Sequence, residues 1–278
     1  MTSSDPSTAP AIAFIGGGNM ARSLIAGLRG RGHPGDRIRV ADPDPDARSA
    51  LARDFGVEAG DDAVAASAGA ELVLLAVKPQ VMAGVCTLLA PAIAEPAPLF
   101  VSIAAGLRSD QIDGWLGGGR AVVRAMPNTP ALLGEGATGL YANGRCGAGQ
   151  RILAESVLAT VGTTAWIADE ALMDVVTAVS GSGPAYFFRL IEALEAAAIR
   201  QGLPAGVARA LVVQTALGAA RMAAAGDEDP ATLRRRVTSP GGTTAAAMAE
   251  FDGQDFDALV DAAVAAAVRR GVELAGQP

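Results

Sequence analysis

The chain has 278 residues, half of them hydrophobic, and a formal net charge of −7. One histidine and two cysteines cannot build a histidine-rich metal site, a zinc cluster or a disulfide framework, and a Ser-His-Asp triad would depend on His33 alone. The negative charge argues against nucleic acid as a partner, because nucleic-acid binders normally carry a basic face. The length predicts one large or two medium domains with a sizeable core.

Residues 1–10 are polar and contain two prolines, so we predict a loose tail rather than a secretory signal. The apolar runs elsewhere are broken by proline, glycine or charge before they reach the roughly 18 residues of a membrane span. We therefore expect a cytoplasmic protein that is not a membrane protein. In that compartment Cys86 and Cys146 would remain reduced thiols.

Short apolar runs alternate with helix-like stretches through the first part of the chain. This alternation indicates βαβ units and a parallel sheet. The predicted strands are 11–15, 37–41, 72–77, 99–103 and 121–124, and the predicted helices include 18–30 and 44–54.

The strand signal stops near residue 168. Apolar residues at i, i+3 and i+4 spacing predict an amphipathic helix over 184–201. Alanine-rich helices are predicted at 205–225, about 241–251 and about 255–275, with a turn from Gly226 to Pro230. Because alanine-rich helices bury little apolar area, we expect the helical part to pack against a second copy of the chain.

A glycine-rich run, Phe14–Ala21, fits the pattern G-x-G-x-x-A directly after a strand and at the start of a helix. In this pattern Gly16 permits the tight turn, Gly18 lets backbone N–H groups approach a pyrophosphate, and Ala21 allows close packing of helix on strand. The alternative is an ordinary strand–helix turn. We predict an α/β chain with an N-terminal Rossmann-type dinucleotide-binding domain at 11–167, followed by an all-α dimerisation domain at 168–278.

Asp42 stands at the end of the second predicted strand, where such domains distinguish NAD from NADP. A carboxylate there accepts hydrogen bonds from a ribose 2′-OH and repels a 2′-phosphate. The equally weighted alternative is that Asp42 caps the next helix, because Asp-Pro-Asp-Pro is a good helix-start signal. No arginine follows before Arg48.

Three further strand ends carry unusual loops, and in a parallel sheet ligands bind at these ends. Lys78 follows the third predicted strand, although a solvated lysine is an equally good interpretation. The small residues 104–106 after the next strand would let a flat ring lie against the backbone. Asn128, in a rigid loop between two prolines, offers amide groups suited to a carboxamide.

In the helical part, the segment 237–244 resembles the start of a helix that binds an anion. Ser239 is a good N-cap, Pro240 suits the first helical position, and Gly241 and Gly242 leave backbone N–H groups uncovered. A carboxylate matches such a site. The alternative is a plain capped helix start with flexible glycines.

Together these motifs resemble the pyrroline-5-carboxylate reductase family, and the resemblance runs from about Ala11 to residue 275. It is carried by IGGGNMA, AVKPQ, SIAAG, RAMPNTP, GEGATGL, SGSGPAY and VTSPGGTT. The resemblance implies reduction of the small molecule 1-pyrroline-5-carboxylate to L-proline by NADPH or NADH. It also implies a Rossmann domain, a helical dimerisation domain and a homodimer that can assemble further into a decamer.

The resemblance assigns roles to residues position by position, with Thr244 as the catalytic residue that hydrogen-bonds the ring nitrogen. The substrate-binding residues are Val237, Thr238, Ser239, Pro240, Gly241, Gly242, Thr243 and Thr244. With the candidate ribose contact Asp42 included, the cofactor-binding residues are Ile15, Gly16, Gly17, Gly18, Asn19, Met20, Asp42, Ala76, Val77, Lys78, Pro79, Ala104, Ala105, Gly106 and Asn128.

The chain departs from the family pattern in two places. Asp61-Asp62 stands where members often have Asn, so that contact is not transferred. Asp42 replaces the Ser, Thr or Asn-Arg pattern of many members, which leaves NADPH and NADH both open.

Two rival functions share features with this chain. β-Hydroxyacid dehydrogenases share the architecture but depend on a lysine after the domain junction, and residues 170–201 contain none, since Lys78 is the only lysine in the chain. A non-catalytic dinucleotide sensor or scaffold would have no need for a site that binds a substrate carboxylate.

Overall fold

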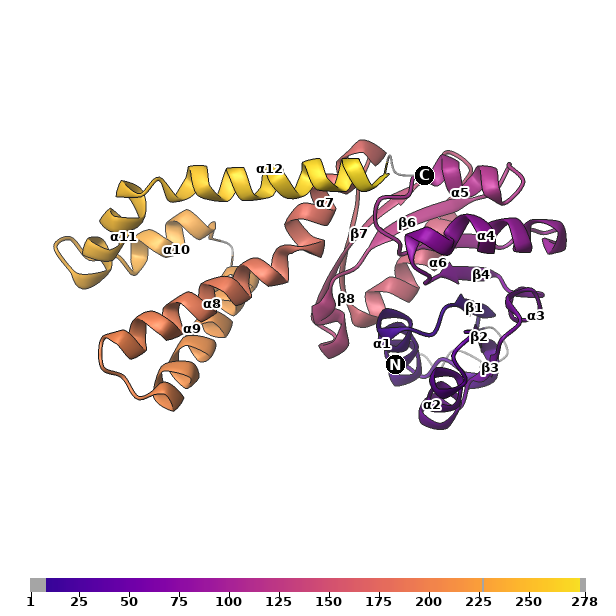
Figure 1. The fold of residues 1–278 in the computed structure, drawn as a ribbon, viewed down its shortest axis with the longest axis horizontal. Coiled ribbons are helices and arrows are strands. Elements are labelled where there is room, and N and C mark those ends of the chain that lie inside the picture. The colour runs from indigo at the N-terminus through magenta and orange to yellow at the C-terminus, as the bar shows by residue number, and fades with distance from the viewer. Residues whose placement is uncertain (1–8, 227, 276–278) are drawn as a thin grey trace. The chain divides into compact units, whose positions relative to one another are not determined.

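The structure, a computed structural model, describes residues 9–226 and 228–275 (Figure 1). By its internal contacts the chain divides into two compact units, one holding the residues up to Ser182 together with those from Ala267 onward, the other Gly183–Ala266. The domain boundary near residue 168 stays a prediction. Most of the expected tail, residues 1–8, lies outside the described residues, whereas the carbonyl of Ala9 accepts a hydrogen bond from Arg37 Nε at 3.0 Å.

One sheet of eight strands forms the framework of the first unit among the residues that are described. Its spatial order is β3-β2-β1-β4-β5-β6-β7-β8, and the part from β3 to β6 has the Rossmann order. The strands are β1 (Ile12–Ile15), β2 (Ile38–Ala41), β3 (Glu58–Gly60), β4 (Leu72–Leu75), β5 (Leu99–Ser102), β6 (Val122–Met126), β7 (Gly136–Ala142) and β8 (Gly162–Trp166).

Helices alternate with these strands and then continue alone, as Figure 1 shows. In the first unit they are α1 (Asn19–Gly30), α2 (Pro45–Phe55), α3 (Ala63–Ser67), α4 (Pro79–Leu89), α5 (Ser109–Trp115), α6 (Ala148–Leu158) and α7 (Met173–Val176). The following helices are α8 (Gly183–Arg200), α9 (Ala205–Ala225), α10 (Pro230–Arg236), α11 (Thr243–Gly253) and α12 (Phe256–Ala275). The expected order of a Rossmann-type domain followed by helices is confirmed.

The sheet has an apolar core on each face. Ile12 and Phe14 pack with α1, α2 and α6, whereas Ala13 and Ile15 pack with α3, α4 and α5. Strands that are buried on both faces need apolar residues at every position, which explains the unbroken apolar runs.

The sheet is parallel, as expected, except at one strand pair. β7 runs antiparallel to β6, with Ala125 opposite Leu140, and β8 then runs parallel to β7. The apolar runs of the sequence did not predict β3, β7 or β8. Strands β7 and β8 both begin at glycine and mix small and polar residues, so their pairing comes from their neighbours in the sheet.

The predicted turn from Gly226 to Pro230 is shorter than expected, because Pro230 is already the first residue of α10. Asp229 caps this helix and accepts hydrogen bonds from the backbone N–H and the Oγ1 of Thr232, both at 2.9 Å. These bonds hold the pKa of the Asp229 carboxyl below its usual value.

The second unit has almost no core of its own. Of its described residues only Gly183 and Ala208 are buried, although α8 packs against α9. Large apolar side chains on α8 and α12, such as Phe187, Phe188 and Leu259, are between 64% and 67% exposed. Across the part of the chain that the structure describes, no helix is long and apolar enough to cross a membrane.

The two cysteines are free thiols. Cys86 on α4 is fully buried, and burial raises its pKa to about 12. Cys146 is half-buried, and burial raises its pKa as well.

Because thiolate is the reactive form, we predict that Cys86 in a Cys146→Ser variant reacts with Ellman's reagent at pH 8 at least about a thousandfold more slowly than a free thiol. Both thiols should react in denaturant, and rapid labelling of Cys86 in the folded protein would contradict this.

Candidate active site

The glycine loop after β1 lies at the carboxyl end of the sheet, between β2 and β4. Gly16 has a φ of 102°, and its N–H donates to the carbonyl of Ala41 at 2.8 Å. A Cβ at position 16 would lie 2.6 Å from the carbonyl oxygen of Ala76. Glycine is therefore required at this position both by its backbone conformation and by lack of space.

Asp42 holds the next residue of this loop. Its Oδ2 accepts the N–H of Gly17 at 2.6 Å, and its Oδ1 accepts the N–H of Asp44 at 2.8 Å. Asp44, and not Asp42, is the N-cap of α2, with its Oδ1 accepting the N–H of Asp46 at 2.9 Å. The alternative that Asp42 caps the helix is thus wrong, whereas its contact with a ribose stays a prediction.

Gly18 leaves the start of α1 open. It is the N-cap of α1, no side chain caps the helix, and no acidic residue stands in the first turn. A Cβ at Gly18 would meet nothing within 4 Å. The free N–H groups, the positive end of the helix dipole and the space beside Gly18 fit a pyrophosphate. The predicted neighbours Asn19 and Met20 are exposed and half-buried, respectively, on the first turn of α1.

Two neighbouring strand ends lie on the other side of the loop. Ala76 and Val77 follow β4, and the exposed Lys78 is the N-cap of α4 with Pro79 as its first residue. Residues 104–106 follow β5, where Gly106 has a φ of 78°. β1 pairs with β2 on one side and β4 on the other, so the strand order reverses here, which is where ligands bind in open α/β sheets.

Asn128 has both of its amide groups engaged within the protein. Its Nδ2 donates to the carbonyl of Ser180 at 3.1 Å, and its Oδ1 accepts the N–H of Ala137 at 2.9 Å. Ser180 belongs to the π-helix η7 (Thr177–Gly181), an uncommon turn that occurs often at functional sites. The side chain thus joins the loop after β6 to β7 and to η7, and its predicted contact with the nicotinamide is not tested by this arrangement.

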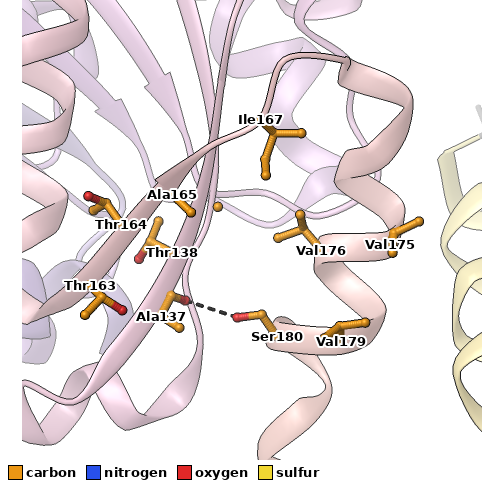
Figure 2. A pocket seen from close by; sticks show the side chains of 11 residues that line it. Ala137, Thr138, Thr163, Thr164, Ala165, Ile167, Val175, Val176, Val179 and Ser180 are labelled. Atoms are coloured by element: carbon orange, nitrogen blue, oxygen red, sulfur yellow. Dashed lines mark hydrogen bonds between the residues drawn. The ribbon is translucent and has the colours of Figure 1, made fainter. Parts of the chain in front are cut away.

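An open apolar hollow of about 350 Å³ lies beside this π-helix, and Figure 2 shows its walls. It is lined by Ala137, Thr138, Gly139, Thr163, Thr164, Ala165, Ile167, Val175, Val176, Val179 and Ser180. Its lining has hydroxyl groups but no acid, base or cation, and it includes none of the predicted cofactor residues. The hollow therefore offers no group for proton transfer or for charge recognition.

The segment 237–244 differs from the prediction in where its helix begins. The N–H of Gly242 donates to the carbonyl of Ser239 at 3.0 Å, and Gly241 has a φ of 69°. Pro followed by Gly with positive φ forms a type II turn, so Ser239 is not the helix N-cap and Pro240 is not helical. Gly242 is the N-cap of α11, and no side chain caps this helix.

Thr243 and Thr244 are consequently the first two residues of α11, rather than one turn inside it. Thr243 is exposed and Thr244 is half-buried. Thr238 donates its hydroxyl back to the carbonyl of Arg234 at 2.7 Å, and Val237 is 60% exposed. The uncapped N–H groups at the start of α11 fit a carboxylate.

Sequence reasoning did not identify one ion pair of the first unit, between a buried arginine and a half-buried glutamate. Arg124 on β6 is 7% exposed, and its Nη1 lies 3.0 Å from Oε1 of Glu170. Glu170 also accepts the N–H and the hydroxyl of Ser109, at 2.6 and 2.8 Å. A charged residue inside an otherwise apolar strand was the available signal. No group of three or more residues able to hold a metal ion occurs within 9–226 and 228–275.

Comparisons with known proteins agree with this geometry. Residues 170–274 match the family described as pyrroline-5-carboxylate reductase dimerisation, and residues 11–106 match NADP oxidoreductase coenzyme F420-dependent. The chain is 52% identical over 268 residues to a pyrroline-5-carboxylate reductase of Pseudomonas aeruginosa, covering 96% of this chain and 98% of that protein.

Two solved structures extend the likeness to three dimensions. A pyrroline-5-carboxylate reductase of Coxiella burnetii superposes with a TM-score of 0.94 at 40% identity, covering 97% of this chain and all of that one. A pyrroline carboxylate reductase of Plasmodium falciparum with NADP bound gives a TM-score of 0.84 at 26% identity, over 96% and 98% of the two chains. On its residues, its fold and these relatives, the chain belongs to the pyrroline-5-carboxylate reductase family.

Proposed function

We propose that this protein reduces 1-pyrroline-5-carboxylate to L-proline with NADH or NADPH, the last step of proline biosynthesis. The observation that carries the proposal is a pair of uncapped helix starts, α1 behind Gly18 and α11 behind Gly242. Each presents backbone N–H groups suited to an anion, and the family to which the chain belongs uses a dinucleotide and a carboxylate substrate. The free thiols fit a reaction in the cytoplasm.

The chemistry asks little of the side chains. The bound dinucleotide supplies the hydride that a cyclic imine needs at carbon. The imine is basic and arrives protonated, so no strong acid is required of the protein. The segment 237–244 binds the carboxylate through the N–H groups of α11, and the Thr244 hydroxyl orients the ring nitrogen. Holding the reacting carbon in near-attack contact is the protein's remaining task.

The helical unit pairs with the same unit of a second chain in this proposal, giving a homodimer that can build a decamer. The support is the near absence of buried residues among the described part of Gly183–Ala266. A helical unit of this size needs a much larger buried apolar area to offset its conformational entropy.

Two glycine substitutions should separate folding from cofactor binding. Gly16→Ala places a methyl group 2.6 Å from a carbonyl oxygen at a φ of 102°, so we expect a loss of about 1–3 kcal/mol or more in unfolding free energy. Gly18→Ala has open space and should lose less than about 1 kcal/mol. It should nevertheless weaken dinucleotide binding about tenfold or more, since the methyl group occupies the place of the pyrophosphate.

Denaturant unfolding and calorimetric titration with NADH measure the two effects. A Gly18→Ala variant that binds the dinucleotide as tightly as the original protein would contradict this placement of the pyrophosphate.

Substitution of Thr244 tests the substrate contact. Thr244→Val removes the hydroxyl at nearly constant volume, and we expect turnover to fall about 10- to 100-fold, as for a lost hydrogen bond to a charged group. Thr244→Ser keeps the hydroxyl and should retain most activity. Far-ultraviolet circular dichroism should be unchanged in both variants. Equal kinetics for the valine and serine variants would remove Thr244 from the mechanism.

The oligomeric state follows from the exposed helices. Sedimentation equilibrium at micromolar concentration should give a mass of at least two chains of 27.8 kDa. Phe187→Glu on α8, where the side chain is 67% exposed, should shift the distribution toward the monomer. A stable, folded monomer of the original protein would refute the proposed pairing.

The activity itself is tested by following NADH or NADPH oxidation with and without 1-pyrroline-5-carboxylate. Oxidation should depend on the imine and should produce L-proline in equal amount. A dinucleotide sensor would bind the cofactor without substrate-dependent oxidation, so failure with both cofactors would favour that rival.

A further inference from the structure

The position of Asp42 indicates which dinucleotide this chain selects. This inference rests on the proposed function and adds the choice of cofactor to it. The Asp42 carboxylate is tied to the pyrophosphate loop itself, because its Oδ2 accepts the N–H of Gly17 at 2.6 Å. It stands at the end of β2, which is where the ribose next to adenine is recognised in Rossmann domains. We propose that Asp42 makes this protein select NADH over NADPH.

The hydrogen bonds of Asp42 leave room for a ribose. A carboxylate offers about four acceptor sites. The N–H groups of Gly17 and Asp44 use one on each oxygen, which leaves acceptor capacity for the 2′-OH and its neighbour. The two backbone bonds fix the carboxylate in place, so it cannot turn away from a 2′-phosphate without leaving two N–H groups unpaired.

The surrounding charges strengthen the discrimination. The segments that follow the paired strands β2 and β3, up to the first turn of α2 in the one case, carry five carboxylates, namely Asp42, Asp44, Asp46, Asp61 and Asp62. The one cation in residues 42–48 and 61–62 is Arg48. Its Nη1 already donates to the carbonyls of Asp42 and Pro43 at 2.8 and 3.0 Å. A 2′-phosphate would therefore meet net negative charge, whereas a neutral hydroxyl meets an acceptor.

A purely structural role for Asp42 predicts something different. If Asp42 only braced the glycine loop, its replacement would weaken NADH and NADPH equally, because both carry the same pyrophosphate. Selection between the cofactors changes the ratio of the dissociation constants of NADH and NADPH. A change in loop stability leaves this ratio unaltered. This ratio is therefore the informative quantity.

The experiment measures dissociation constants of NADH and NADPH for the full-length protein by nicotinamide fluorescence, without substrate. The original protein should bind NADH about tenfold or more tightly than NADPH, and Asp42→Asn or Asp42→Ser should reduce this ratio about tenfold. Asp46→Asn is the matched control, because it removes a charge from the same segment without the bond to Gly17, and it should change the ratio by at most about threefold.

Two results would overturn the proposal: tighter or equal binding of NADPH by the original protein, or an Asp42 variant that weakens both cofactors equally. If the variants do not fold, the salt dependence of binding by the original protein still tests the proposal. Repulsion is screened by salt, so the preference for NADH should shrink as ionic strength rises from about 0.01 to about 1 M, and a preference that salt leaves unchanged would overturn it. Selective binding without imine reduction would instead refute the proposed function alone.

Discussion

The close approach of β1 to the end of β4 is the constraint from which the arrangement of the cofactor loop follows. A Cβ on Gly16 would lie 2.6 Å from a backbone oxygen, and backbone cannot move aside as a side chain can. The chain therefore turns sharply at this point, at the place where the strand order reverses. The same turn directs the N-terminus of α1 toward the carboxyl edge of the sheet.

Three consecutive glycines serve three different physical needs. Gly16 avoids a collision with the backbone after β4, Gly17 avoids a Cβ at 2.8 Å from Cδ1 of Leu51, and Gly18 leaves space at the start of α1. The helical unit has a second uncapped helix start, α11 behind Gly242, where a Cβ would lie 3.1 Å from the carbonyl oxygen of Ser239. In the proposed function, both helix starts bind their ligands through backbone donors.

Sequence patterns predicted the strands and loops whose signal lies within a few consecutive residues. The strands β1 and β4 are apolar throughout, and β2, β5 and β6 are mostly apolar, because they are covered on both faces. The glycine motif lies within a single turn. β7 and β8 were missed because glycine and alanine, which are depleted in strands, interrupt both segments, and pairing in the sheet makes these segments extended. The order of the two domains was predictable from the change in hydrophobic pattern alone, from short apolar runs to apolar residues at helical spacing.

The site was predicted unevenly for similar reasons. Ser239 and Pro240 matched a helix start, but Pro-Gly also matches a type II turn, and the positive φ of Gly241 favours the turn. The partners of Asn128 are 9 and 52 residues away in sequence, so its amide contacts could not be read from its own loop. From the sequence, Asp42 could be either a ribose contact or a helix cap. The structure excludes the cap, because Asp44 is the N-cap of α2.

The proposed reaction depends on direct transfer of hydride between two bound ligands. The most direct measurement uses NADH or NADPH carrying deuterium on the transferring face of nicotinamide carbon 4, with 1-pyrroline-5-carboxylate as the acceptor. Direct transfer predicts one deuterium at carbon 5 of the L-proline formed, as read by mass spectrometry and nuclear magnetic resonance. Proline without deuterium, or cofactor oxidation without proline, would contradict it.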